Sequence, residues 1–230
     1  LVKRDINKAI YYYKLAANQN DPQAQFNLGL IYDDGILIER DINKSIHYFT
    51  LAANQNMVEA QFNLGIIYEE GGSITRNINK SIYYYTLAAN QNYIKAQFNL
   101  GIIFLDGKYV TRDINKSIYY FTLAANKNDI QSQYNLGLIY EEGKYIKRDI
   151  NKSIHYFTLA ANQNDPQAQF NLGLIYYDGK YIKKDIAKSI YYYTLAAKQN
   201  IPQAQYNLGL IYEKGEYIKK NINKSIYYFT

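Results

Sequence analysis

The sequence contains no cysteine and only two histidines, His47 and His155. Without cysteine the chain can form neither disulfides nor thiolate metal sites, and the redox compartment is left open. Long apolar runs are also missing, because none approaches the roughly 20 residues that span a bilayer. The mean hydropathy is −0.41. We therefore expect no membrane insertion.

The sequence also lacks a strong excess of one charge sign. The net charge is +6 and charged residues make up 20% of the chain, with both signs interspersed. The sequence pI is about 9.1. This mixed surface differs from a basic tail or stripe, so nucleic acid is disfavoured as a partner.

The chain does contain one sequence motif that recurs at a fixed spacing of 36 residues. Residues 60–68 read AQFNLGIIY, and the first residue of each copy is Ala24, Ala60, Ala96, Ser132, Ala168 or Ala204. An unbroken period of this length indicates tandem helical units, each burying a face against the next. We expect one array over residues 1–230, with about six repeats cut at both ends. The chain begins with Leu rather than Met, so we expect it to be part of a longer protein.

Each repeat is predicted to hold two helices, which we call helix A and helix B. In residues 21–56, Asp21 and Pro22 are typical of a helix start, and Gly35 is typical of a residue that follows a helix end. Helix A therefore runs from residue 22 to about Tyr32. Its predicted core side chains are Ala24, Leu28, Ile31 and Tyr32.

Helix B is predicted to begin after a short polar residue that accepts a hydrogen bond from a first-turn amide. That position is occupied by Asp5, Asp41, Asn77, Asp113, Asp149, Asp185 and Asn221. The apolar stripe of this helix comprises Ile42, Ser45, Ile46, Phe49, Ala52 and Ala53. Asn56 and its copies are suited to the left-handed turn that ends it.

These residues together resemble the Sel-one-like repeats, a 36-residue branch of the tetratricopeptide-like family. The matching helix A positions are Ala24, Leu28, Gly29, Tyr32 and Gly35. The matching helix B positions are Asp41, Lys44, Ser45, Tyr48, Phe49, Ala52 and Ala53. The resemblance covers essentially the whole chain. It implies an all-α, right-handed superhelical solenoid that acts as a scaffold or adaptor for other proteins.

The sequence departs from the family at two turn positions. Where the family usually has a second glycine, this chain has Leu37, Ser73, Tyr109, Tyr145, Tyr181 and Tyr217, so a loop tyrosine is available to pack down. Where the turn after helix B usually has glycine, this chain has Asn56 and its copies.

Catalytic chemistry has little support in the pattern. Both histidines are expected on the outer face of helix B, and the carboxylates fall at helix caps and ends. We expect no enzymatic activity, no catalytic residues, no metal site and no cofactor.

A basic edge is the first candidate surface. It comprises Lys108, Arg112, Lys144, Lys147, Arg148, Lys180, Lys183, Lys184, Lys219 and Lys220. Such residues can track the phosphates of a nucleic acid or another acidic polymer. Acidic residues close the preceding helices, however, which favours local neutralisation and solubility.

An outer stripe on helix B is the second candidate. It pairs His47, Tyr83, Tyr119, His155, Tyr191 and Tyr227 with Leu51, Leu87, Leu123, Leu159 and Leu195, four residues further along. A contact surface and scattered surface apolar residues explain this stripe equally well.

An inner ladder on helix A is the third candidate, since the resemblance places helix A on the concave side. Its amides are Asn27, Asn63, Asn99, Asn135, Asn171 and Asn207, and its aromatics are Phe26, Phe62, Phe98, Tyr134, Phe170 and Tyr206. The resemblance implies that such an Asn holds the backbone of an extended peptide. The alternative is that each Asn bonds a neighbouring helix, and both remain open.

Both ends of the array are predicted to lack a covering helix. Residues 5–18 form a helix B with no helix A before it, and the last helix B stops at Thr230. Because uncapped repeats expose apolar surface, we expect self-association through the ends.

Overall fold

The computed structural model describes residues 6–36, 38–215 and 221–229, and within these ranges all regular structure is helical. The helices in the helix A position are α2 (Pro22–Asp34), α4 (Val58–Glu70), α6 (Ile94–Asp106), α8 (Ile130–Glu142), α10 (Pro166–Asp178) and α12 (Pro202–Lys214). Those in the helix B position are α1 (Ile6–Asn18), α3 (Ile42–Asn54), α5 (Ile78–Asn90), α7 (Ile114–Ala125), α9 (Ile150–Asn162), α11 (Ile186–Lys198) and α13 (Ile222–Phe229). The prediction of an all-α fold built from tandem helix pairs is confirmed.

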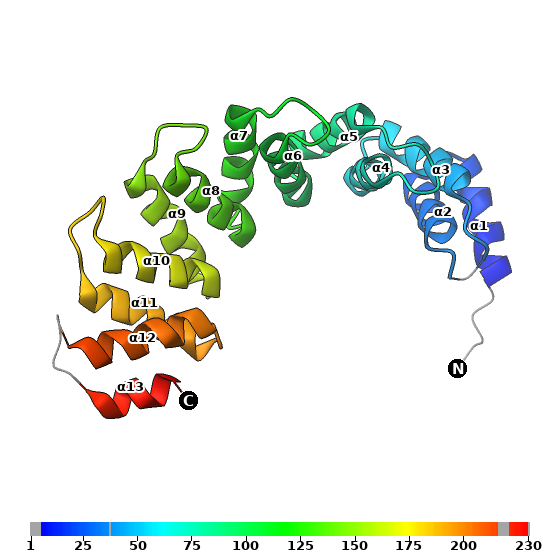
Figure 1. Cartoon of the computed structure of the whole chain (residues 1–230). Coiled ribbons are helices and arrows are strands. Elements are labelled where there is room, and N and C mark those ends of the chain that lie inside the picture. The colour runs from blue at the N-terminus through cyan, green and yellow to red at the C-terminus, as the bar shows by residue number, and fades with distance from the viewer. Residues whose placement is uncertain (1–5, 37, 216–220, 230) are drawn as a thin grey trace. The chain divides into compact units, whose positions relative to one another are not determined.

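The chain divides into two compact units, residues 1–120 (unit 1) and 121–230 (unit 2), with the boundary inside α7. Successive helices pack on one another from α1 to α6 in unit 1 and from α8 to α13 in unit 2 (Figure 1). Helices α8 and α10, both in the helix A position, also contact each other directly. Adjacent helices A therefore share one surface within unit 2.

The predicted caps start most of these helices. The Asp21 carboxylate accepts a hydrogen bond from the Ala24 amide at 2.6 Å, and the Asp41 carboxylate accepts one from the Lys44 amide at 3.0 Å. Equivalent bonds form at Asn77, Asp113, Asp149, Asp185 and Asn221. Asp5 lies outside the described residues. These bonds satisfy amides that have no partner within the helix.

The turn from helix B to helix A is made by asparagine in the left-handed conformation. The residues with positive φ are Asn20, Asn56, Asn92, Asn128, Asn164 and Asn200, at 61–65°. After α3 the chain reverses direction, and the Met57 amide donates to the Ala52 carbonyl at 3.2 Å. Asparagine tolerates this conformation better than other residues with a Cβ, which confirms the predicted role of Asn56.

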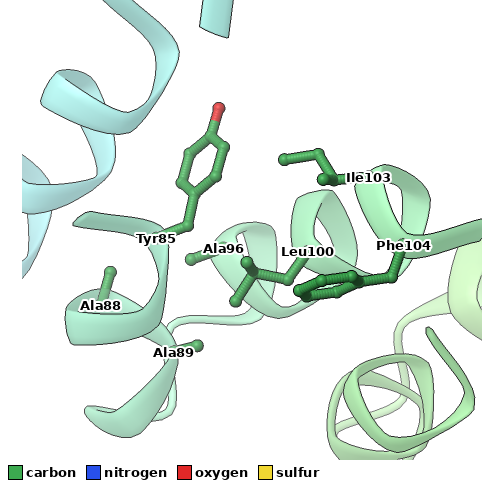
Figure 2. Packing of buried hydrophobic residues seen from close by; sticks show 7 residues of the cluster. All are labelled: Tyr85, Ala88, Ala89, Ala96, Leu100, Ile103 and Phe104. Carbon is green, nitrogen blue, oxygen red and sulfur yellow. The ribbon is translucent and has the colours of Figure 1, made fainter. Parts of the chain in front are cut away.

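Helix A and helix B meet where a glycine faces an aromatic ring. A Cβ built on Gly137 would lie 2.5 Å from Cδ1 of Phe157, closer than carbon atoms can pack. Five residues at this ring position are fully buried: Phe49, Tyr85, Phe121, Phe157 and Tyr193. Figure 2 shows Tyr85 in one such cluster, with its hydroxyl oxygen pointing away from Ala88 and Ala89. The glycine is therefore required for close packing of the pair.

Glutamine side chains connect successive repeats inside the stack. Gln61 is 1% exposed and its amide nitrogen donates to the Ala53 carbonyl at 3.2 Å. The Gln91 amide nitrogen donates in turn to Gln61 Oε1 at 2.8 Å. The same bond links Gln55 to Gln25, Gln163 to Gln133, and Gln199 to Gln169. A buried amide with partners on both sides fixes the register between neighbouring repeats.

Candidate functional site

The Asn ladder lies half-buried on helix A, three residues in each unit. Its members make different contacts. Asn27 Oδ1 accepts from Gln23 Nε2 at 3.1 Å, and Asn135 Nδ2 donates to the Gln131 carbonyl at 2.8 Å. These two bonds stay within one helix, so they leave donor or acceptor capacity on each amide.

Other ladder amides face a neighbouring helix. Asn171 Nδ2 donates to the Tyr134 hydroxyl over a long 3.5 Å, and the Asn99 side chain approaches the Tyr85 hydroxyl. These two contacts are examples of an Asn that bonds a neighbouring helix, whereas peptide binding by the ladder stays a prediction. The six Asn residues thus repeat regularly in the sequence but make different contacts in the structure. They differ in how many hydrogen-bond donors and acceptors remain for a partner.

The aromatic ladder packs mainly against the repeat core. Phe62 lies 5.6 Å from the Tyr85 ring, and Phe170 lies 5.8 Å from the Tyr193 ring. The Tyr134 ring lies 5.7 Å from Phe157, and Phe98 is half-buried. Only Tyr206, at 56% exposed, presents most of its ring among the described members. These aromatics contribute chiefly to packing, and the amides beside them hold the free polar capacity.

A cavity opens at the loop end of the helix A surface in unit 2, with a volume of about 570 Å³. Its floor is apolar, with Ile150, Leu174 and Ile175 among the lining residues. Its charged lining residues are Glu141, Glu142, Arg148, Asp178 and Lys180, and Tyr177, Tyr181 and Ile182 complete it. We call this the unit 2 pocket.

Unit 1 has a related pocket two repeats earlier, with a volume of about 450 Å³. It is lined by Ile66, Glu69, Glu70, Arg76, Tyr85, Asn99 and Tyr109. Asn99 belongs to the amide ladder, so this pocket and the ladder form one continuous surface in unit 1. We call this the unit 1 pocket.

The two pockets differ in the hydrogen bonding of one glutamate carboxylate, that of Glu69 in unit 1 and that of Glu141 in unit 2. In unit 1 the Tyr85 hydroxyl donates to Glu69 Oε2 at 2.7 Å. In unit 2 the residue equivalent to Tyr85 is Phe157, which has no hydroxyl, and its ring packs on Gly137 as the Tyr85 ring packs on Gly65. Within the described part of the chain, neither a hydrogen bond nor an ion pair reaches the Glu141 carboxylate. Burial, and then the charge of Glu142, raise the pKa of Glu141.

The basic edge has a structural role in the residues that the structure describes. Arg148 Nε donates to the Glu141 carbonyl at 2.6 Å, and Nη2 donates to the Glu142 carbonyl at 3.0 Å. Arg40, Arg76 and Arg112 make the equivalent bond to a helix-end carbonyl. A cation at the C-terminus of a helix also interacts favourably with the helix dipole. Lys219 and Lys220 lie outside the described residues.

The loop tyrosines that replace the family's second glycine pack across repeats. The Arg76 guanidinium lies 4.4 Å from the centroid of the Tyr109 ring, and Arg148 lies 4.5 Å from that of Tyr181. Each arginine belongs to the loop of the preceding repeat. The sequence predicted a tyrosine that packs down but not its arginine partner, although both recur at the repeat spacing and a separation of 33 residues marks the pair.

Comparison with known proteins identifies the family. A model described as "Sel1 repeat" matches residues 1–21, 22–57, 58–93, 94–129, 130–165, 166–201 and 202–230. The chain belongs to the Sel1 repeat family. Proteins of this family are generally non-catalytic scaffolds for protein interactions.

Two solved structures share the fold of this Sel1 repeat chain. One is c5321, a protective antigen of uropathogenic Escherichia coli strains with an SLR fold, at 32% identity and a TM-score of 0.85; the match covers 96% of this chain and 47% of that one. The other is a Sel1 repeat protein from Oxalobacter formigenes, at 28% identity and a TM-score of 0.83, covering 99% of this chain and 67% of that one. The chain thus spans about half the length of the antigen. No protein with a curated description matches the sequence.

The outer stripe of this Sel1 repeat chain is exposed as expected. Tyr83, Tyr119 and Tyr191 are 57–59% exposed, whereas the leucines four residues later are half-buried. Each tyrosine also makes an edge-on contact with the next tyrosine, 5.1 Å away for Tyr83 and Tyr84. The stripe thus presents single rings rather than a continuous apolar patch.

The histidines and carboxylates lie apart from one another. Among the described residues, His, Asp and Glu form no group of three able to hold a metal ion. His47 and His155 are exposed on helix B, each stacked edge-on against the next tyrosine. In the same part of the chain, no helix is both long and apolar enough to cross a bilayer.

Proposed function

We propose that this chain is a protein-interaction scaffold that binds an extended segment of a partner protein along the helix A surface. The observation that carries the proposal is the repeated pocket at the loop end of that surface, which joins the amide ladder at Asn99. Apolar floors and a few convergent polar groups are typical of binding sites.

The spacing of the ladder suits a peptide better than a small molecule. Helices pack about 10 Å apart, so the three amides of unit 2 extend over about 20 Å, the length of about six extended residues. The amides Asn135 and Asn171 would pair with peptide backbone groups. Side chains of the peptide would enter the pockets and supply specificity.

The nucleic-acid alternative has less support. Both arginines of the basic edge already donate to helix-end carbonyls, and Arg148 also stacks on the Tyr181 ring. A phosphate would have to compete with these contacts. Binding to mixed nucleic acid that falls steeply with salt would nevertheless favour that alternative.

The test uses peptides selected from a random 12-residue display library against the whole chain. The double variant Asn135→Ala and Asn171→Ala should weaken binding of the selected peptides about tenfold, because each amide bond is worth roughly 0.5–1.5 kcal/mol. The control is Tyr191→Ser with Leu195→Ser on the outer stripe of the same unit.

Circular dichroism establishes that both double variants remain folded. Peptide affinity that is lost with the outer variant and retained with the Asn variant would contradict the helix A proposal. It would assign binding to the outer stripe of helix B instead.

A further inference from the structure

The two pockets share four equivalent lining positions, two glutamates, one arginine and one tyrosine, but they differ in what contacts the first of the two glutamates. Glu69 and Glu141 occupy equivalent positions at the end of helix A, as do Arg76 and Arg148. In unit 1 the glutamate accepts a hydrogen bond from the Tyr85 hydroxyl. In unit 2 the described residues supply no such donor. The unit 2 pocket therefore contains a half-buried carboxylate whose partner must come from outside the chain or from water.

The cations that line the unit 2 pocket are already engaged. Arg148 uses Nε and Nη2 for the carbonyls of Glu141 and Glu142, and Nη1 donates to the Tyr181 hydroxyl. Lys180 lies over the Tyr181 ring, 5.2 Å from its centroid. Both cations are thus directed to backbone oxygens and to an aromatic ring.

The balance of charge in this pocket is negative. Three carboxylates, those of Glu141, Glu142 and Asp178, line it together with two cations, Arg148 and Lys180. The remaining lining is apolar or aromatic. A side chain with an aliphatic stem and a cationic head matches both features, because the stem covers apolar surface while the head pairs with a carboxylate.

We propose that the unit 2 pocket binds one lysine or arginine side chain of the partner segment, with the Glu141 carboxylate as its ion-pair partner. This inference rests on the proposed function for the identity of the ligand as a peptide. The unit 1 pocket binds the same side chain more weakly, since the Tyr85 hydroxyl already donates to one oxygen of its glutamate. Within unit 2, the pocket thus sets the register of the bound segment by one cationic residue.

An anionic ligand fits the same pocket poorly. Three of the five N–H donors of Arg148 are already bonded, and a phosphate or carboxylate would face three carboxylates. Burial, and then the charge of Glu142, raise the pKa of Glu141, and the charge of Arg148 offsets this effect only in part. A cation bound beside the Glu141 carboxylate would lower this pKa. Binding of the cation should therefore weaken on acidification, as Glu141 takes up a proton.

The test measures the pocket with small probes, independently of any partner protein. The ¹⁵N-labelled chain is titrated at neutral pH with N-acetyl-arginine methylamide and N-acetyl-lysine methylamide, and with the norleucine analogue as an uncharged control. The affinity expected for probes of this size is in the millimolar range. Chemical shift changes should be confined to amides near Glu141 and the 174–182 segment.

Two variants decide the role of the carboxylate. Glu141→Gln should weaken binding of the cationic probes about tenfold, because a hydrogen-bonded charge pair is lost. Phe157→Tyr places in unit 2 the hydroxyl that Tyr85 supplies in unit 1, and should weaken the same probes severalfold. Tyrosine already occupies the equivalent buried positions 85 and 193, so this variant is compatible with the fold.

The outcomes separate this inference from the proposed function. Equal shifts with the norleucine probe, no shifts with the cationic probes, or full binding by Glu141→Gln would each overturn the cationic pocket. Library peptides that bind the helix A surface without enrichment of lysine or arginine would also overturn it while leaving the scaffold proposal in place. Cationic probes that bind while no peptide contacts helix A would refute the proposed function alone.

Discussion

Tyr85 and Tyr193 provide a matched pair for measuring what a buried hydroxyl contributes to this array. They occupy equivalent positions in helix B, and both side chains are fully buried. The Tyr85 hydroxyl donates to Glu69 at 2.7 Å. The residue equivalent to Glu69 in the other repeat is Tyr177, and among the described residues no group meets hydrogen-bond geometry with the Tyr193 hydroxyl, although Asn207 lies near it.

The two substitutions to phenylalanine should therefore have different effects on the free energy of unfolding. Tyr85→Phe removes a hydrogen bond to a charged group, worth about 1.5–3 kcal/mol. Because Glu69 is half-buried and water can replace part of that bond, we expect a loss of about 1–2 kcal/mol. Tyr193→Phe removes a buried hydroxyl without a good partner, so stability should stay unchanged or rise by up to about 1 kcal/mol.

Urea unfolding followed by circular dichroism measures both effects. Repeat arrays unfold with limited cooperativity, so amide hydrogen exchange in α5 and α6 should accompany the measurement for Tyr85, and in α11 and α12 for Tyr193. The expected result is faster exchange around Tyr85→Phe only. Equal losses of stability in both variants, or a larger loss for Tyr193→Phe, would refute a stabilising role for the bond between Tyr85 and Glu69.

Two further predictions concern unit 2. Gly137→Leu should lower the free energy of unfolding by about 1–3 kcal/mol or more, because the leucine side chain must enter the contact with Phe157. The control Gln131→Leu, on the exposed side of the same helix, should have little effect. An unchanged urea midpoint for Gly137→Leu would contradict the close-packing role of this glycine. The pKa of Glu141 is higher in the folded chain than in the unfolded chain. The unfolded chain therefore releases this proton at a lower pH, and stability falls as the pH rises above the unfolded pKa. Glu141→Gln should thus raise the thermal midpoint at neutral pH, by an amount that shrinks toward about pH 4, where the unfolded glutamate is half protonated; a variant that is less stable than the parent at neutral pH would contradict this reasoning.

The features that were predicted correctly from the sequence depend on interactions between residues close in the chain. A cap such as Asp41 bonds an amide three residues away, and Asn56 ends a helix through its own backbone preference. The core stripe follows from helical spacing, which places Leu28 and Phe49 inward wherever the helices pack.

The contacts that could not be predicted join residues of different helices or different repeats. The stacking of Arg76 on Tyr109 depends on the distance between neighbouring repeats, and the bond from Gln91 to Gln61 depends on the packing of helices within one repeat. The basic edge was an open alternative in the sequence, because only the folded chain shows Arg148 turned to helix-end carbonyls.

The sequence alone determined the repeat length, the helix pairs, their caps and the family, since a 36-residue period and local backbone preferences fix these whatever lies next to each unit. The tertiary structure decided which polar groups remain available for a partner. Asn99 approaches a tyrosine hydroxyl while Asn135 bonds its own helix, and Glu69 has a donor while Glu141 has none among the described residues. These differences arise because a hydrogen bond requires two groups within about 3 Å, and folding alone brings together residues that lie 14 or 16 positions apart in sequence.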